Sequence, residues 1–123
     1  MKGEEITVAG LIKLIESGER KNIRLRNWEL ARLFGVYEQT IRANVKAIIQ
    51  SNVVMPDSDS EFVQAGKTFL PVVHGLEIII ALAFRLHSPD ADRLKKWTID
   101  KIVHRTDNKM IVFGINNNLQ VLN

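Results

Sequence analysis

The sequence predicts a mainly α-helical protein with a small β-hairpin, and three observations carry this prediction. Apolar residues recur at helical spacing in five stretches between residues 8 and 104, which is the pattern of amphipathic or buried helices. Two short runs, residues 61–65 and 68–73, flank Gly66-Lys67 and have the composition of paired strands around a turn. Of the 123 residues, 46% are hydrophobic and 25% are charged, so the chain can bury a core without disulfide or metal support.

The composition excludes several classes of protein. The chain has no cysteine, which excludes disulfides, thiolate metal sites and cysteine nucleophiles. Its longest apolar-rich stretch, residues 76–86, contains Glu77 and Arg85 and is too short to cross a bilayer. Glu4 and Glu5 stand where a secretory leader would be basic. We therefore expect a cytoplasmic protein with no membrane partner.

The first third of the chain predicts two helices with a brief strand between them. Thr7 precedes an apolar stripe that Ser17-Gly18 can end, so we expect a helix between these residues. Residues 23–26 alternate apolar and basic side chains, which favours a short strand. We expect Asn27 to cap the next helix, because its side-chain oxygen can accept a backbone N–H, and that helix should span residues 28–34.

A third helix is predicted over residues 37–50. Its inward face carries apolar residues at positions i, i+4, i+7 and i+8, namely Ile41, Val45, Ile48 and Ile49. Residues 52–55 favour a strand, and residues 56–60 favour a polar turn. The hairpin follows, and its second strand should lie at a sheet edge because Pro71 has no N–H to donate.

The last third of the chain predicts two helices and a strand. Residues 76–86 are apolar nearly all round, which is typical of a buried helix. Ser88-Pro89-Asp90 is a strong helix start, because Ser can cap, Pro fits the first position and Asp meets the positive end of the helix dipole. That helix should run to about residue 104. Residues 109–115 favour a C-terminal strand, and residues 116–118 favour a turn.

Residues 27–46 have the layout of a helix-turn-helix. Ala31 is small where the two helices must cross closely, and Gly35 permits the positive φ of a tight turn. Ile41 and Val45 can then pack the second helix back against the first. The expected fold is a helix-turn-helix, winged-helix-like domain over residues 1–73, with the hairpin as a possible wing. Residues 74–123 should form a two-helix core and dimerisation segment that ends in the strand.

The same residues resemble the helix-turn-helix of Cro-like repressors from bacteria and phages. The run from Gly35 to Arg42, Gly-Val-Tyr-Glu-Gln-Thr-Ile-Arg, is similar to the turn and recognition helix of a phage Cro repressor. Asn44 departs from that pattern, because many members carry an apolar residue there. The resemblance implies DNA binding through the second helix of the motif.

A second resemblance covers the C-terminal half of the chain. Residues 74–86, followed by Ser88, Leu94-Lys95 and Trp97, resemble the RhuM-type virulence-protein family. The chain departs from that family at His74-Gly75, where the family has Tyr-Asn. Together the two resemblances span residues 20–105. The second implies a DNA-binding region without a defined biochemical mechanism.

The charge distribution agrees with a nucleic-acid partner. Residues 20–46 carry seven Lys and Arg against two Glu, a net charge of +5 in a chain whose total is +3, and such a segment attracts a polyanion. We therefore predict a sequence-specific, double-stranded DNA-binding protein, a transcriptional regulator of mobile-element or phage-like type. We expect a homodimer, because one short helix contacts too few base pairs for useful specificity.

The residue types assign roles within the predicted interface. Helix 37–50 would lie in the major groove with its N-terminal part on base edges. Gln39 has the donor and acceptor pair that matches adenine, and Arg42 has the fork that matches guanine. The residues expected to flank these contacts are Tyr37, Glu38 and Thr40. The residues expected to contact phosphates are Arg24, Arg26, Asn27, Trp28 and Lys46.

The leading alternative is a non-enzymatic adaptor that binds proteins through the apolar helix 76–86 and the uncharged C-terminal tail. The sequence offers no recognisable Ser-His-Asp grouping and no metal-ligand spacing, so we predict no catalytic site, no metal and no cofactor. His74, His87 and His104 are expected to be ordinary surface or boundary residues. We expect the stripe around Trp97 to be core, and we expect no small-molecule effector.

Overall fold

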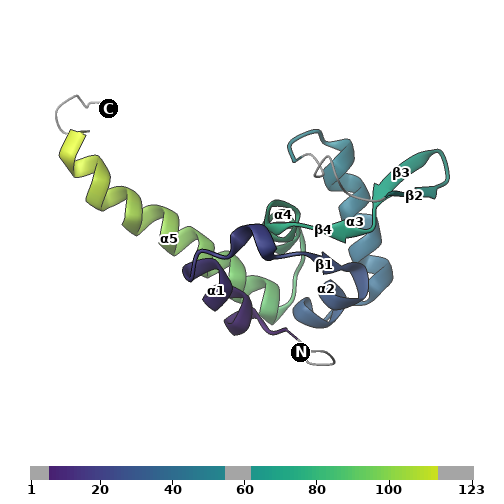
Figure 1. Cartoon of the computed structure of the whole chain (residues 1–123), viewed down its shortest axis with the longest axis horizontal. Helices are drawn as coiled ribbons and strands as arrows, with labels where there is room; N and C mark the ends of the chain where they lie inside the picture. The colour runs from purple at the N-terminus through teal and green to yellow at the C-terminus, as the bar shows by residue number, and fades with distance from the viewer. Residues whose placement is uncertain (1–5, 55–61, 114–123) are drawn as a thin grey trace.

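The computed structural model describes residues 6–54 and 62–113. Most of these residues are helical, and the short strands form two small antiparallel pairs (Figure 1). In chain order the elements are α1 (Val8–Glu16), a 3₁₀ turn (Arg20–Asn22), β1 (Leu25–Arg26), α2 (Asn27–Phe34), α3 (Glu38–Gln50), β2 (Phe62–Ala65), β3 (Thr68–Pro71), β4 (Val73–His74), α4 (Leu76–Arg85) and α5 (Pro89–Phe113). The predicted fold class, mainly α with a small β-hairpin, is confirmed.

Strands β2 and β3 form the predicted hairpin. They pair antiparallel with Phe62 opposite Pro71, and Gly66 adopts the left-handed φ of 67° at the turn. Val72 interrupts the expected second strand, and the two residues of β4 that follow it pair with β1 instead. One nearly continuous segment therefore joins the hairpin to the strand that precedes α2. The order α1, β1, α2, α3 and hairpin is that of a winged helix.

The five α-helices of the described residues share one hydrophobic core. Phe34 of α2 is completely buried, and fully buried apolar side chains also come from the other four helices, including Leu11, Ile41, Ile79, Leu82 and Leu94. Each such Leu or Ile stabilises the fold by about 1.5–3 kcal/mol. Helix α4 is buried along the face that carries Ile79 and Leu82, but Phe84 on another face is 45% exposed, so the prediction of a helix buried nearly all round is only partly correct. Among the described residues, no helix is both long and apolar enough to cross a bilayer.

Two predicted helix starts are confirmed by their hydrogen bonds. At α1, the Thr7 hydroxyl oxygen accepts a hydrogen bond from the Gly10 N–H at 3.1 Å. At α5, the Ser88 hydroxyl oxygen accepts one from the Ala91 N–H at 3.1 Å. The same hydroxyl donates to the Phe34 carbonyl oxygen at 2.6 Å, and Ser88 is buried. Ser88 thus caps α5 and also ties it to the last residue of α2.

Replacing Ser88 by alanine should lower the free energy of unfolding by about 1–3 kcal/mol, because it leaves the buried Phe34 carbonyl and the Ala91 N–H without their partner. Urea unfolding measures this loss. Ser17→Ala is the matched control, because the Ser17 hydroxyl donates to the Leu14 carbonyl at an exposed site, and we expect a change below about 0.5 kcal/mol there. Equal losses in the two variants would show that burial of the Ser88 bond contributes nothing.

The predicted cap at Asn27 is wrong. Arg26 occupies the N-cap position, and Asn27 is the first residue of α2. The Glu29 carboxylate reaches back and accepts a hydrogen bond from the Arg26 N–H at 2.8 Å, which is how an acidic residue in the first turn stabilises a helix start. The Asn27 side chain is therefore available for a different partner.

The strand predicted over residues 52–55 is also wrong where the structure describes it, up to residue 54. These residues form a turn at the end of α3, and Asn52 adopts the left-handed φ of 62°. The Asn52 N–H donates to the Ile49 carbonyl, and the Val53 N–H donates to the Ser51 hydroxyl oxygen. Because the end of the helix uses these groups, they do not pair with a strand. Met55 and the polar turn over 56–60 lie outside the described residues.

The C-terminal strand predicted over residues 109–115 is wrong for residues 109–113, which continue α5. Helix α5 is 25 residues long and runs well beyond residue 104, so its far end projects away from the body of the molecule (Figure 1). A short apolar run fits a strand or a helix equally well by periodicity. Here the backbone groups are satisfied within the helix, so no partner strand is needed. The predicted turn over 116–118 lies outside the described residues.

Candidate nucleic-acid interface

Gly35 makes the turn of the helix-turn-helix as predicted. Its φ of 67° and ψ of 40° are left-handed, a conformation that costs glycine least. The N–H groups of Gly35 and Val36 both point to the Ala31 carbonyl oxygen, which closes α2. Beyond the turn, Ile41 and Val45 are at most 1% exposed and hold α3 against the core.

This packing leaves the opposite face of α3 in solvent. The exposed residues on that face are Glu38, Gln39, Arg42, Ala43 and Lys46. The prediction on which the DNA-binding hypothesis depends, that Gln39 and Arg42 point outward, is confirmed. Tyr37, the N-cap of α3, is 82% exposed beside them. Thr40 is half-buried, so it offers less to a ligand than its neighbours do.

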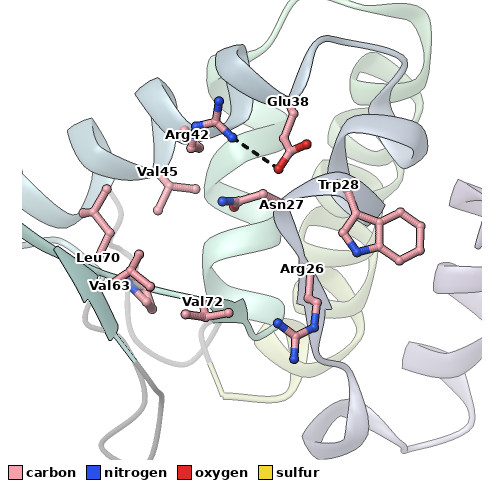
Figure 2. A pocket seen from close by; sticks show the side chains of 10 residues that line it. Arg26, Asn27, Trp28, Glu38, Arg42, Val45, Val63, Leu70 and Val72 are labelled. Carbon is pink, nitrogen blue, oxygen red and sulfur yellow. Dashed lines mark hydrogen bonds and ion pairs between the residues drawn. The ribbon is translucent and has the colours of Figure 1, made fainter. Parts of the chain in front are cut away.

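Arg42 is held by an ion pair along its own helix. Its Nη1 lies 3.2 Å from the Glu38 Oε2, and both side chains are about half exposed, at 53% and 46% (Figure 2). An exposed pair one turn apart contributes only about 0.3–0.5 kcal/mol. A bidentate contact of arginine with guanine contributes about 1–3 kcal/mol. The pair therefore orients Arg42 but is weak enough to yield to a stronger contact.

A pocket of about 220 Å³ lies between α3, the start of α2 and the hairpin segment (Figure 2). Five of the predicted interface residues line it, namely Arg26, Asn27, Trp28, Glu38 and Arg42. The rest of the lining is apolar and comes from α3 and the hairpin segment, namely Val45, Val63, Leu70, Pro71 and Val72. The pocket therefore has one polar, mainly cationic side and one apolar side.

The other predicted residues do not line this pocket. Tyr37 is the N-cap of α3, Gln39 and Thr40 belong to its first turn, and Lys46 lies one turn after Arg42. Arg24 is exposed just before β1. Trp28, which contributes to the pocket lining, is 50% exposed, and its ring lies 5.9 Å from the Arg32 guanidinium, a distance at which a cation attracts an aromatic face.

His74 is not the surface or boundary residue that the sequence predicts. It is 1% exposed, and its Nε2 lies 2.7 Å from the Asn27 Oδ1. Burial lowers its pKa from 6.5 to about 4, because the charged imidazolium loses solvation. The ring is therefore neutral near pH 7, and Nε2–H donates to the Asn27 oxygen. The pairing of Leu25 in β1 with His74 in β4 brings His74 next to Asn27. No local sequence signal predicts that pairing.

Asn44 has a role that the sequence analysis missed. Its Nδ2 donates to the Thr40 carbonyl oxygen at 2.9 Å, and its Oδ1 accepts from the Arg85 Nε at 2.9 Å. The first bond lies within α3, and the second connects α3 to the end of α4. Asn44 therefore supplies a polar link between α3 and α4.

No grouping in the described part of the chain suggests a metal site. His87 and His104 are exposed, and no three His, Asp or Glu side chains among the described residues gather closely enough to hold an ion. In the stripe around Trp97, Ala91 and Leu94 are fully buried and Trp97 is half-buried against the core, whereas Ile102 is 61% exposed. The arrangement at α3 instead offers hydrogen-bond donors and cations on an exposed surface.

No family model, no curated protein and no solved structure matches this chain. The resemblances to the Cro-like repressors and to the RhuM-type family therefore stay predictions.

Proposed function

We propose that the chain is a cytoplasmic, sequence-specific double-stranded DNA-binding protein that regulates transcription in a mobile-element or phage-like setting. The observation that carries the proposal is the outward placement of Gln39 and Arg42 on the first two turns of α3. A helix of 13 residues with one face in solvent fits the major groove, and its N-terminal residues are the ones that contact bases in a helix-turn-helix.

The positions of several cations support the same function. Arg26 and Arg42 line one pocket, Lys46 follows Arg42 by one helical turn, and Lys67 is exposed at the turn of the hairpin. Cations on both sides of the α3 face can neutralise phosphates along a duplex whose groove holds α3. The wing is then the hairpin, with Lys67 at its tip.

A homodimer is part of this proposal. Ile99, Ile102 and Val103 are between 47% and 61% exposed on α5, at spacings that place them along one side of the helix. This part of α5 lies away from α3 and the hairpin (Figure 1). Pairing of two copies through this stripe would leave both α3 helices free for DNA.

The adaptor hypothesis receives less support from the described residues. It depends on an apolar surface of α4, but the core takes Ile78, Ile79 and Leu82 of that helix, each at most 3% exposed. Phe84 alone remains as a large exposed apolar side chain on α4. The uncharged tail beyond residue 113 lies outside the described residues.

Selection of bound sites from random duplex DNA tests the proposal directly. We expect one enriched sequence, and an affinity that falls linearly with salt on logarithmic axes. Lys46→Ala should weaken binding to all sequences alike and reduce the salt slope by about 0.9, the value of one phosphate contact. Lys96→Ala is the matched control, because Lys96 is exposed on α5 and its removal should leave the slope unchanged. Salt-independent binding, or no enriched sequence, would reject sequence-specific DNA binding.

A further inference from the structure

The buried pair of His74 and Asn27 has a consequence for the pocket beside α3. Asn27 Oδ1 is occupied by the His74 ring at 2.7 Å, and Asn27 Nδ2 has no hydrogen-bond partner among the described residues. Figure 2 shows the amide nitrogen pointing into the pocket, between Arg42 and the apolar wall. Two N–H donors are thus aimed at a space that the protein itself does not fill.

The lining of the pocket defines what can enter. Arg26 and Arg42 supply positive charge, and Glu38, the acidic group of the lining, is already paired with Arg42. Val63, Leu70 and Val72 of the hairpin segment form the apolar wall, and Val45 lies beside Arg42 on α3 (Figure 2). An anion that carries an apolar ring or chain complements both sides, since N–H donors and guanidinium groups bind phosphate oxygens. A sugar-phosphate unit has this combination of properties.

The placement of the pocket identifies that unit as part of a DNA strand. If α3 lies in a groove and the hairpin lies beside it, as in the proposed function, a sugar-phosphate backbone must pass between the two elements. The pocket lies between these two elements (Figure 2).

We propose that this pocket holds one phosphodiester group of the DNA, and that His74 is a positioning residue that aims the Asn27 amide at it. The inference rests on the proposed function. His74 does not contact the DNA, because it is 1% exposed. It donates Nε2–H to the Asn27 oxygen and so fixes which end of the amide faces the pocket. A donor that is already oriented binds its ligand without the entropic cost of ordering a free side chain.

A double-mutant cycle on duplex binding tests this inference. Asn27→Ala should weaken binding to every duplex alike, by about tenfold or more, because a hydrogen bond to a charged phosphate is lost. His74→Leu should weaken it by about threefold to tenfold, again with unchanged sequence preference, since the donor remains but is no longer oriented. In the Asn27→Ala background, His74→Leu should have no further effect. His74→Gln, which can still donate to Asn27, should recover part of the loss.

Two controls separate positioning from general stability. Urea unfolding under the binding conditions establishes that each variant is folded, and affinities are referred to the folded fraction. Asn27→Asp keeps an acceptor for His74 but replaces the donor by a carboxylate, and it should weaken binding more than Asn22→Asp, which adds the same charge at an exposed residue outside the pocket. Additive losses from His74→Leu and Asn27→Ala would show that His74 acts only on stability and would overturn its positioning role.

The identity of the anion is tested with modified DNA. A neutral methylphosphonate, placed at each backbone position of the selected duplex in turn, should weaken the wild type at one position and weaken Asn27→Ala much less there. Binding of inorganic phosphate that Asn27→Ala abolishes, with no backbone position of the duplex depending on Asn27, would assign the pocket to a free anion and overturn the inference. If the wild type binds the duplex but no position depends on Asn27, the inference fails while the proposed function stands. If it binds no duplex, both fail.

Discussion

Replacing Gln39 and Arg42 together by alanine should reduce affinity for the selected duplex by about 2–6 kcal/mol, because each side chain can make a bidentate base contact of about 1–3 kcal/mol. Both residues are exposed on α3, and neither belongs to the core. Binding to random duplex DNA should fall much less, because only the Arg42 charge is lost from the phosphate-facing surface. Titration of both duplexes at one salt concentration measures the specificity ratio.

The control for this double variant is Gln50→Ala with Arg93→Ala. It removes the same two side-chain types from exposed positions, at the far end of α3 and on α5. The specificity ratio should then stay that of the wild type. An equal ratio in both double variants would mean that α3 does not contact bases through Gln39 and Arg42.

Acid should destabilise the protein through His74. The unfolded chain takes up a proton on this residue near pH 6.5, whereas the folded protein resists protonation until about pH 4. Between these values the unfolded state binds more protons, so stability is complete above about pH 6.5 and is lost as the pH falls toward 4. With about 1.4 kcal/mol per pKa unit, the loss reaches about 3 kcal/mol.

Urea unfolding from neutral pH down to about pH 4 gives this profile. Carboxylates titrate in the same range, so the informative quantity is the difference between the wild type and His74→Leu. That difference should change by up to about 3 kcal/mol across the window. Parallel profiles for the two proteins would show that His74 is protonated as readily in the folded state as in the unfolded chain.

Local signals in the sequence predicted the motif well. The turn at Gly35, the cap at Ser88, the start of α1 after Thr7 and the apolar stripe of α3 each depend on neighbours within a few residues, so composition and spacing specify them. The prediction of a cap at Asn27 was wrong because the Glu29 carboxylate, in the first turn of α2, accepts the hydrogen bond from the Arg26 N–H at the helix start. Propensity alone does not decide between two such competing solutions.

Contacts between segments that are distant in the sequence limit how much of the candidate site can be predicted. Residues at the start of α2 meet Glu38 and Arg42 because the turn at Gly35 folds α3 back, and this much follows from the motif. The apolar wall depends on where the hairpin lies relative to α3, and the burial of His74 depends on its pairing with Leu25. The spacing of apolar residues within a segment specifies neither the position of the hairpin relative to α3 nor the pairing of His74 with Leu25. The polar half of the pocket could therefore be predicted, and the apolar half could not.

The hydrogen bond from Ser88 to the Phe34 carbonyl has a mechanical consequence. It joins the base of α5 to the corner of the motif, and Asp90 in the first turn of α5 also lies close to Gly35, 3.6 Å from where a Cβ on that glycine would be. The long helix and the α2–α3 corner are therefore braced together rather than hinged. A load applied to the outer end of α5 would reach that corner without crossing a flexible linker.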